Sequence, residues 1–391
     1  MKIVFWIALF IVFYTYIGYG ILLYIIIRLK RPFVGRPHEA VLPADEELPT
    51  MTLMICAYNE EDIVKEKMAN TLALDYPKDK FRIMWVTDGS NDHTNELLAA
   101  YPEVDIVFSP ERRGKTAALK HGLRELKTRY VAFTDANTMI NTGALREIAR
   151  LFSDPTVGCV SGEKRVAARK AGEMASEGEG LYWRYESTLK RWDSELYSAM
   201  GAAGELYAID PQLCREVPDE ALLDDFMLSM YVVQAGKRIA YTSDAYAREY
   251  GSANIYEESK RKRRIAAGGL QSIWWLRSML NPLRQPLVTF QYVSHRVLRW
   301  SITPVAMVLL LIVNIALVAM GAGTFYTVML ILQTLFYLMA LAGWLTNRFG
   351  YKNKLLYTAY YFVFMNFNVF RGMAYLRSHG KSGAWEKAKR S

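Results

Sequence analysis

Long apolar runs lie toward both ends of the chain, with a region of mixed character between them. Residues 5–27 are apolar apart from Thr15, two glycines and several tyrosines. At 1.5 Å per helical residue, this run is long enough to cross a hydrocarbon core of about 30 Å. Its length, the lone Lys2 before it and the lack of a small-x-small cleavage site argue against a secretory signal peptide. We therefore expect an uncleaved transmembrane anchor over residues 1–28.

A second group of apolar segments lies in the C-terminal part. Residues 301–320 and 325–345 are separated only by GAGT, which predicts a transmembrane hairpin. Basic residues follow the anchor and flank both ends of the hairpin, so the positive-inside rule places the middle of the chain in the cytosol. We expect a multi-pass protein of the cell membrane whose catalytic domain is cytoplasmic.

A third apolar segment, residues 355–370, has two interpretations. If it spans the membrane, the basic tail at 377–391 lies outside, against the charge rule; if it lies in the interface, the tail stays in the cytosol. We favour the second interpretation. The C-terminal region is thus expected to hold transmembrane or interfacial helices over 296–376, followed by the tail.

Between residues 49 and 162, short apolar runs alternate with amphipathic stretches. The runs are TLMICAY, FRIMWVT, VDIVF, YVAFTDA and VGCVSG. Such alternation predicts βαβ units and a largely parallel sheet, with ligands bound beyond the carboxyl ends of the strands. We expect an α/β cytosolic domain over residues 29–255 and basic interfacial amphipathic helices over 256–295.

Composition and charge narrow the functional classes. The chain has 391 residues, is 52% hydrophobic and carries a formal charge of +9. Much of the positive excess sits beside apolar segments, where it serves topology and contact with anionic membrane lipids, and no nucleic-acid-binding motif accompanies it. The three cysteines show neither CxxC spacing nor a disulfide framework, which fits a reducing cytosol.

Carboxylate and amide groups gather where the predicted strands end. They are Asn59, Glu60, Asp88, Asp92, Asp135 and Asn137. A phosphate loop ending at Lys115 would need a glycine where Ser109 stands, and GxGxxG is absent. Each polar group alone could be a helix cap or a turn residue, as Ser90 and Asp92 are expected to be. Together they favour a site for a nucleotide and a divalent cation.

Seven stretches carry a resemblance to a known family. They are CAYNEE, TDGSNDHT, RRGKTAAL, TDANT, GAAGELYAID, LLDDFMLS and KRKRRIAAGGLQ. In order and spacing they resemble membrane-embedded family-2 glycosyltransferases such as hyaluronan, chitin-oligosaccharide, poly-N-acetylglucosamine and cellulose synthases. The resemblance implies a Rossmann-like, GT-A type nucleotide-sugar-binding domain. It also implies inverting transfer from a UDP-sugar with Mg²⁺ or Mn²⁺.

The resemblance assigns residues to the sugar donor and the metal. Those that match the uridine-binding positions are Ala57, Tyr58, Glu60 and Asp88. Lys115 matches the basic residue beside the nucleotide, and Asp135 and Asn137 match the DxD motif. The second carboxylate of that motif is an amide here, which binds a hard cation more weakly. Either Asp135 carries more of the metal, or the metal affinity is modest.

The resemblance also assigns residues to the acceptor and the chemistry. Gly201 and Gly204 match a segment where a sugar approaches the backbone, with Asp224 beside the acceptor. Asp225 falls where the family keeps its catalytic base, since an attacking hydroxyl must lose its proton. Arg264 matches the arginine of the QxxRW motif, which can stabilise the departing diphosphate.

The same motif departs from the family at two positions. Arg261 stands for the glutamine and Ile265 for the tryptophan, whose indole can stack on a sugar. Processive synthesis is therefore doubtful, and Trp274 and Trp275 are more simply interfacial anchors. For Arg261, Lys262 and Arg263 we prefer contact with lipid phosphates over a role in the site.

The C-terminal sequence GAWEKAKRS is similar to a tail that some relatives fold over the nucleotide, which makes Trp385 and Arg390 a candidate lid. The leading expectation is an enzyme that extends a polysaccharide or oligosaccharide, with export partner subunits conceivable. The first alternative is a single transfer to a polyprenyl- or other lipid-linked acceptor. A remote alternative is a catalytically silent scaffold subunit of an export complex.

Overall fold

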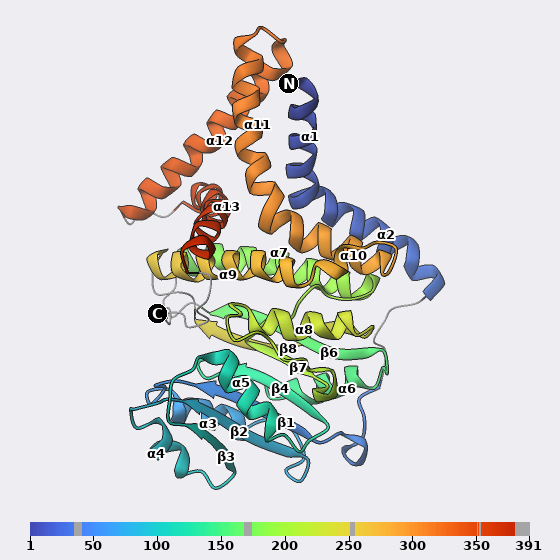
Figure 1. Ribbon diagram of the computed structural model, residues 1–391, viewed down its shortest axis with the longest axis vertical. Coiled ribbons are helices and arrows are strands. Elements are labelled where there is room, and N and C mark those ends of the chain that lie inside the picture. Colours follow the sequence, from blue (N-terminus) through green and yellow to red (C-terminus); the bar gives the residue numbers. More distant parts are fainter. Residues whose placement is uncertain (35–40, 168–173, 251–254, 350, 352, 380–391) are drawn as a thin grey trace.

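The chain is arranged in three tiers in the computed structural model (Figure 1). A strand-rich domain forms the lower tier, helices α7 (Met174–Leu196) and α9 (Ile255–Trp275) lie across its top, and apolar helices rise above them. The structure describes residues 1–34, 41–167, 174–250, 255–349, 351 and 353–379.

One mixed sheet organises the lower tier. Its order in the described residues is β3-β2-β1-β4-β7-β6-β8-β5. The strands are β1 (Met51–Ala57), β2 (Phe81–Asp88), β3 (Val104–Ser109), β4 (Tyr130–Asp135), β5 (Met139–Ile140), β6 (Val157–Ala167), β7 (Leu206–Ile209) and β8 (Arg238–Tyr250). Strands β1 to β4 are mutually parallel, as the sequence predicts. The other half is mixed because β7 runs antiparallel to β4 and β6.

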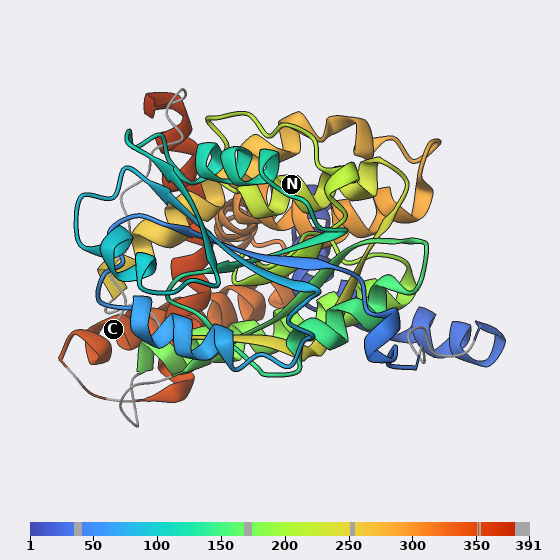
Figure 2. The ribbon, with the colours of Figure 1, turned by 90° about the horizontal axis from the view of Figure 1, so that it is seen from below.

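Helices cover both faces of the sheet (Figure 2). They are α3 (Val64–Leu72), α4 (Thr94–Ala99), α5 (Lys115–Arg124), α6 (Ala144–Phe152) and α8 (Asp224–Gln234), with 3₁₀ turns η2 (Asp45–Glu47) and η3 (Pro211–Leu213). Successive residues of a buried strand point to opposite faces. Leu53 therefore enters one hydrophobic core with Trp85, while Met54 enters the other with Phe133.

The parallel register brings the polar strand ends together at one edge. Cys56 pairs with Asp135 across β1 and β4, and Ala57 pairs with Thr87 across β1 and β2. Asp88 closes β2 opposite Ser109 of β3. The turns that follow β1, β2 and β4 therefore lie side by side at one edge of the sheet, between the parallel strands and α9.

The upper tier contains the expected anchor and hairpin. The anchor runs through α1 (Lys2–Phe13), η1 (Tyr14–Gly18) and α2 (Tyr19–Val34), and the hairpin through α10 (Pro286–Tyr292), η5 (Val293–Ile302), α11 (Thr303–Ala319) and α12 (Thr324–Arg348). A short turn, η4 (Arg277–Leu280), precedes α10. Among the described residues, three helices are long and apolar enough to cross a membrane: Lys2–Phe33, Pro286–Ala319 and Thr324–Arg348.

The third C-terminal segment forms α13 (Lys354–His379), which is not one of these candidate spans. It is seen nearly end-on in Figure 1, whereas α11 stands upright. Gly372 lets it approach α9 closely, because a Cβ there would come 2.7 Å from the backbone nitrogen of Ala267. The interfacial interpretation of residues 355–370 stays a prediction.

Basic residues of η5, which precedes the long apolar helix α11, bind acidic partners on α7. The carboxylate of Glu186 accepts ion pairs from Arg296 at 2.7 Å and Arg299 at 3.0 Å. His295 contacts Asp193 at 2.5 Å through Nδ1. All three basic residues are buried. They therefore fasten the second candidate span to α7, a function that charge counting along the sequence does not reveal.

Candidate active site

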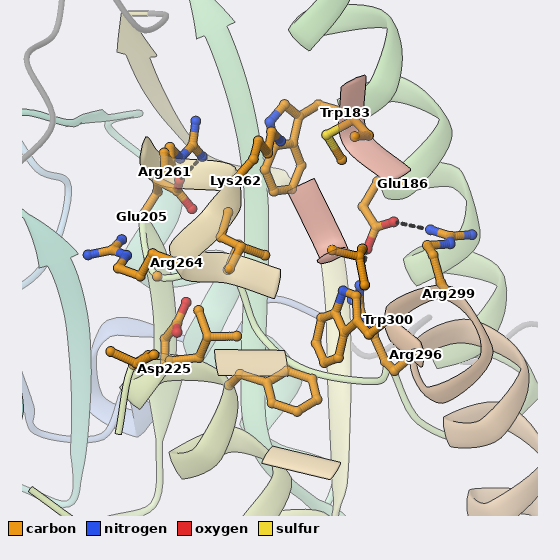
Figure 3. A pocket seen from close by; sticks show the side chains of 18 of the residues that line it. Trp183, Glu186, Glu205, Asp225, Arg261, Lys262, Arg264, Arg296, Arg299 and Trp300 are labelled. Carbon is orange, nitrogen blue, oxygen red and sulfur yellow. Dashed lines mark hydrogen bonds and ion pairs between the residues drawn. The ribbon is translucent and has the colours of Figure 1, made fainter. Parts of the chain in front are cut away.

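A cavity of about 460 Å³ lies where the three tiers meet. One side, which we call the near wall, carries the predicted site residues Lys115, Asp135, Gly204, Asp224, Asp225 and Arg264. The opposite side, the far wall, carries Tyr16, Trp183, Glu186, Lys190, Arg296, Arg299 and Trp300 together with residues of α13. Figure 3 shows Asp225 and Arg264 facing Glu186, Arg299 and Trp300 across the pocket.

The start of α8 is held in place by α9. The side-chain oxygen of Gln271 accepts the N–H of Leu222 at 3.1 Å, and its amide donates to the carbonyl of Glu220 at 3.0 Å. A Cβ on Gly268 would lie 2.6 Å from Cγ of Leu223, so only glycine permits this approach without a shift. Gly268 and Gln271 of α9 thus position the turn that carries Asp225.

Asp225 combines burial with a neighbouring like charge. Burial and the charge of Asp224 raise its pKa to about 6, while Lys115 acts in the opposite direction. A carboxyl group with this pKa is mostly ionised at neutral pH and remains basic enough to accept a proton. One oxygen of Asp224, Oδ2, is buried without a hydrogen-bond partner among the described residues.

The two predicted acceptor glycines make room for side chains of α8. A Cβ on Gly204 would come 2.7 Å from Oδ2 of Asp225. Gly201 has a φ of +96° and faces the ring of Phe226, with which a Cβ would overlap. Gly204 lines the cavity, whereas Gly201 lies behind Phe226. Both glycines therefore fix the position of the carboxylate-bearing helix.

Lys115 and Asp135 form the charged pair of the near wall. Nζ of Lys115 donates to Oδ1 of Asp135 at 2.8 Å. Burial acts to lower the pKa of Lys115, but the charges of Asp135, Asp224 and Asp225 raise it well above its usual value. This lysine is therefore a permanent positive charge beside the strand end.

Asp88 supports Lys115 through the backbone. Its buried carboxylate accepts the N–H of Gly114 at 2.6 Å and the N–H of Arg113 at 3.0 Å. These bonds hold the loop from which α5 begins at Lys115. In this structure Asp88 therefore acts as a positioning residue, and it does not line the cavity.

The remaining predicted nucleotide-binding residues lie beyond the end of β1. Ala57 is buried at the strand end, and the ring of Tyr58 stacks with Arg112 at 3.9 Å. The N–H of Glu60 donates to the hydroxyl of Thr94 at 2.9 Å. These residues border the second turn but not the cavity, so the two sets of predicted site residues occupy adjoining regions.

The turn after β2 is held by the residues expected to shape it. Oγ of Ser90 accepts the N–H of Asn59 at 3.1 Å. The carboxylate of Asp92 accepts the N–H of Thr94 at 3.0 Å and that of Glu61 at 3.2 Å. Ser90 and Asp92 therefore fasten this turn to the turn after β1.

Arg264 lines the cavity with an incomplete set of hydrogen-bond partners among the described residues. Its Nε is buried and has no hydrogen-bond partner among the described residues. Burial lowers the pKa of Arg264, and the charge of Asp224 is the main effect that raises it. A guanidinium placed this way can bind an anionic group that enters the cavity.

The expectation that Arg261 and Lys262 contact lipid phosphates is wrong. Both are buried: Arg261 lies 3.6 Å from Glu205, and Lys262 lies 3.4 Å from Glu258. Glu205 also pairs with Lys164 at 2.6 Å. Buried charges are costly unless they are paired, and these residues form an internal network of ion pairs that also lines the cavity.

The far wall was not predicted. Its indoles, Trp183 and Trp300, come from α7 and from the π-helical segment η5, more than one hundred residues apart. Trp300 packs edge-on to Phe226 with ring centroids 5.0 Å apart. The sequence signal for this wall is the recurrence of acidic and basic residues at helical spacing in α7.

The candidate metal ligands form an incomplete set. Asp135 and Asn137 offer one carboxylate and one amide oxygen, and no cluster of three or more His, Cys, Asp or Glu occurs in the part of the chain that the structure describes. Hard divalent cations accept such oxygens together with substrate phosphates and water. The residues thus fit a weakly held Mg²⁺ or Mn²⁺. The predicted lid residues, Trp385 and Arg390, lie outside the described residues.

Comparisons with known proteins indicate the family and the fold that this chain resembles. Residues 52–209 match the family described as glycosyl transferase family 2. A poly-beta-1,6-N-acetyl-D-glucosamine synthase of Staphylococcus aureus is 35% identical over 125 residues, which are 31% of this chain and 30% of that protein. A beta-monoglucosyldiacylglycerol synthase of Synechocystis is 25% identical over 57% of this chain and 48% of its own length. The chain thus matches only a third to a half of these relatives.

A solved structure resembles nearly the whole chain. The mannosyltransferase PcManGT from Pyrobaculum calidifontis, in complex with GDP-Man and Mn²⁺, aligns with a TM-score of 0.68 and 21% identity. It covers 95% of this chain and 98% of its own. The shared arrangement supports the GT-A-like α/β fold with apolar helices at both ends. Residues 52–209 thus match glycosyl transferase family 2, within a chain that resembles the membrane-embedded synthases of that family.

Proposed function

We propose that this protein is a membrane-bound inverting glycosyltransferase that moves a sugar from a UDP-sugar to an acceptor hydroxyl at the cytosolic membrane face. The observation that carries the proposal is Asp225, a buried carboxylate with a raised pKa in a cavity shared with Lys115, Asp135 and Arg264. Burial, a carboxylate base and cations for a leaving group are what such a transfer requires.

The chemistry proposed for Asp225 is proton removal. The acceptor oxygen attacks the anomeric carbon of the donor sugar while its proton passes to the carboxylate of Asp225. The bond between that carbon and the diphosphate oxygen breaks, and the nucleoside diphosphate leaves. Attack opposite the leaving group inverts the anomeric configuration, so no covalent enzyme intermediate is needed.

Cations on the near wall would bind the leaving diphosphate. Lys115 and Arg264 lie on the same side of the cavity as Asp225 and can neutralise charge that develops on the departing oxygen. Asp135 and Asn137 would hold Mg²⁺ or Mn²⁺, which supplies further positive charge to the diphosphate when bound. Ala57, Tyr58, Glu60 and Asp88 are proposed to receive or support the nucleoside at the adjoining strand ends.

The acceptor is proposed to occupy the space between the two walls. Our leading hypothesis is a growing polysaccharide or oligosaccharide, in line with the named activity of the Staphylococcus aureus relative. A single transfer to a lipid-linked acceptor is the second candidate. It is favoured by Ile265 in place of an indole on the near wall and by the apolar residues Phe362, Met365 and Val369 that α13 adds to the cavity.

Product analysis tests the proposal. Purified protein in lipid nanodiscs would be supplied with Mn²⁺, a panel of UDP-sugars and lipid extract, and released UDP and products would be measured by mass spectrometry. We expect one donor to give UDP release and a glycosylated product. A long polymer supports the first acceptor class, and one sugar added to a lipid supports the second. No turnover of any UDP-sugar by correctly folded protein would contradict the proposal.

A further inference from the structure

One buried cation of the cavity is not used by the proposed chemistry. Lys190 of α7 is only 4% exposed, lines the far wall and forms no hydrogen bond or ion pair among the described residues. The Nζ of Lys190 lies 6.0 Å from the centroid of the Trp183 ring. Burying an ammonium group is costly unless a counter-charge accompanies it.

Two of the acidic groups near Lys190, Glu186 and Glu205, are already engaged in ion pairs. Both oxygens of Glu186 are bound, one by Arg296 at 2.7 Å and the other by Arg299 at 3.0 Å. Glu205 is paired with Lys164. Burial, together with the charge of Arg296, lowers the pKa of Lys190 to about 8, against the opposing charges of Glu186, Glu205 and Asp225. The far wall thus has an excess of positive charge.

The donor diphosphate does not account for this excess. Its proposed cations are Lys115 and Arg264, whereas Lys190 and Arg296 come from other elements of the lining, α7 and η5. Figure 3 shows Arg296 across the pocket from Arg264 and Asp225. An anion at Lys190 must therefore belong to the molecule on the other side of the reaction, the acceptor.

The shape of the cavity indicates what carries that anion. The space extends from Asp225 to α13, whose side chains Phe362, Met365 and Val369 form an apolar part of the lining. This end lies against the candidate membrane spans, since Tyr16 of the first span also lines it. An acceptor with a polar head, an anionic linkage and an apolar chain would match Asp225, Lys190 and the apolar residues of α13, respectively.

We propose that the acceptor is a saccharide joined through a phosphate or diphosphate to a lipid chain, and that Lys190 pairs with that phosphate. The proposal rests on the glycosyltransferase function proposed above and selects the second acceptor class. A neutral glycolipid would leave Lys190 buried without a partner. An acidic glycan without a lipid would leave the apolar lining unused.

Equilibrium binding to the full-length protein in nanodiscs tests this assignment without turnover. The probes are N-acetylglucosaminyl diphosphofarnesol, the neutral farnesyl N-acetylglucosaminide and a lipid-free acidic trisaccharide. We expect the wild type to bind the diphosphate probe at least about tenfold more tightly than either other probe. Lys190→Gln should remove this preference, and Lys190→Arg should retain most of it. Lys65→Gln, a change of an exposed lysine on α3, should have no effect.

Each contrary result has a distinct meaning. Equal binding of the neutral probe by wild type overturns the role of the phosphate, and equal binding of the acidic trisaccharide overturns the role of the lipid. If Lys190→Gln weakens all probes alike, the residue is structural and the proposal fails. UDP binding, measured on the same samples, separates this inference from the proposed function. Wild type that binds UDP but shows no preference for the diphosphate probe refutes only this inference. Wild type that binds no UDP refutes the glycosyltransferase function as well.

Discussion

The carboxylate of Asp225 owes its properties to burial, to the adjacent Asp224 and to two residues that are distant in sequence, Lys115 and Gly204. Asp224 raises its pKa, Lys115 opposes that rise, and Gly204 leaves the space that its oxygen occupies. Asp225 and Gly204 were identified from motifs. The balance between burial and the two charges is a property of the folded site and cannot be read from residue spacing.

The raised pKa predicts a pH dependence. Because the base must be ionised to accept a proton, kcat/KM should fall about tenfold for each pH unit below about 6, where Asp225 becomes protonated, and should level off above it. Asp224, Lys115 and Glu205 are the charged groups that act on it. Steady-state rates between pH 5 and 8 check this. A profile that stays flat down to pH 5 would exclude Asp225 as the base.

Gly204→Ala should displace the base without unfolding the protein. The new methyl group would meet Oδ2 of Asp225 at 2.7 Å, so the carboxylate must move. We expect kcat to fall by about a hundredfold, since misplacement by an ångström has effects of this size, with the KM for donor little changed. Gly143→Ala is the control because no atom lies within 4 Å of its Cβ position. Equal activity in the two variants would contradict the assigned contact.

At the same scale, some residues could not be predicted at all. Lys190 and Trp300 meet in one cavity only because α7 and η5 pack together, and nothing in either segment's local sequence indicates the other. Arg261 and Lys262 were misassigned because a basic run beside apolar helices is typical of lipid contact. Their acidic partners include Glu205, which lies more than fifty residues earlier in the chain.

Among the elements, two π-helical segments are the least expected feature. Segments η1 and η5 interrupt the first two candidate spans and contact each other through Tyr14 and Ser294, whose hydroxyls are 2.7 Å apart. π-helices are rare and frequently occur at functional sites. Here they contribute Tyr16 and Trp300 to the cavity. Hydrophobic periodicity predicts the spans but not these irregularities within them.

Helix α13 forms one side of the cavity, and its closeness to α9 depends on Gly372. Gly372→Ala should push α13 away, because the added carbon would meet the backbone nitrogen of Ala267 at 2.7 Å. We expect a several-fold higher KM for acceptor and an unchanged KM for donor. Ala374→Ser, at an exposed position of the same helix, is the control. A change in donor KM alone would show that α13 does not border the acceptor space.

On the scale of the whole molecule, the sequence predicted the arrangement well. The anchor, the parallel strands and the hairpin follow from hydrophobic periodicity, which depends only on local burial. The mixed half of the sheet was missed because β7 inserts between β4 and β6, an antiparallel pairing that local patterns do not encode. The convergence of the polar strand ends was foreseen because it follows from parallel register alone.

The placement of α13 predicts the side of the C-terminus. Since α13 packs against α9 and is not one of the candidate spans, the residues after His379 should be on the same side of the membrane as the sheet domain. Protease treatment of sealed inside-out vesicles should remove a C-terminal tag and cleave the sheet domain alike. A tag cleaved only when protease acts from the opposite face would show that α13 spans the membrane.

The central claim is that Asp225 removes the proton from an acceptor in a nucleotide-sugar transferase. The most direct measurement compares wild type, Asp225→Asn and the exposed-site control Asp79→Asn for UDP release in single-turnover reactions, with donor binding measured in parallel. We predict that Asp225→Asn lowers the transfer rate by at least about a hundredfold, while donor binding and the control stay near wild type. Transfer by Asp225→Asn at the wild-type rate would contradict the account.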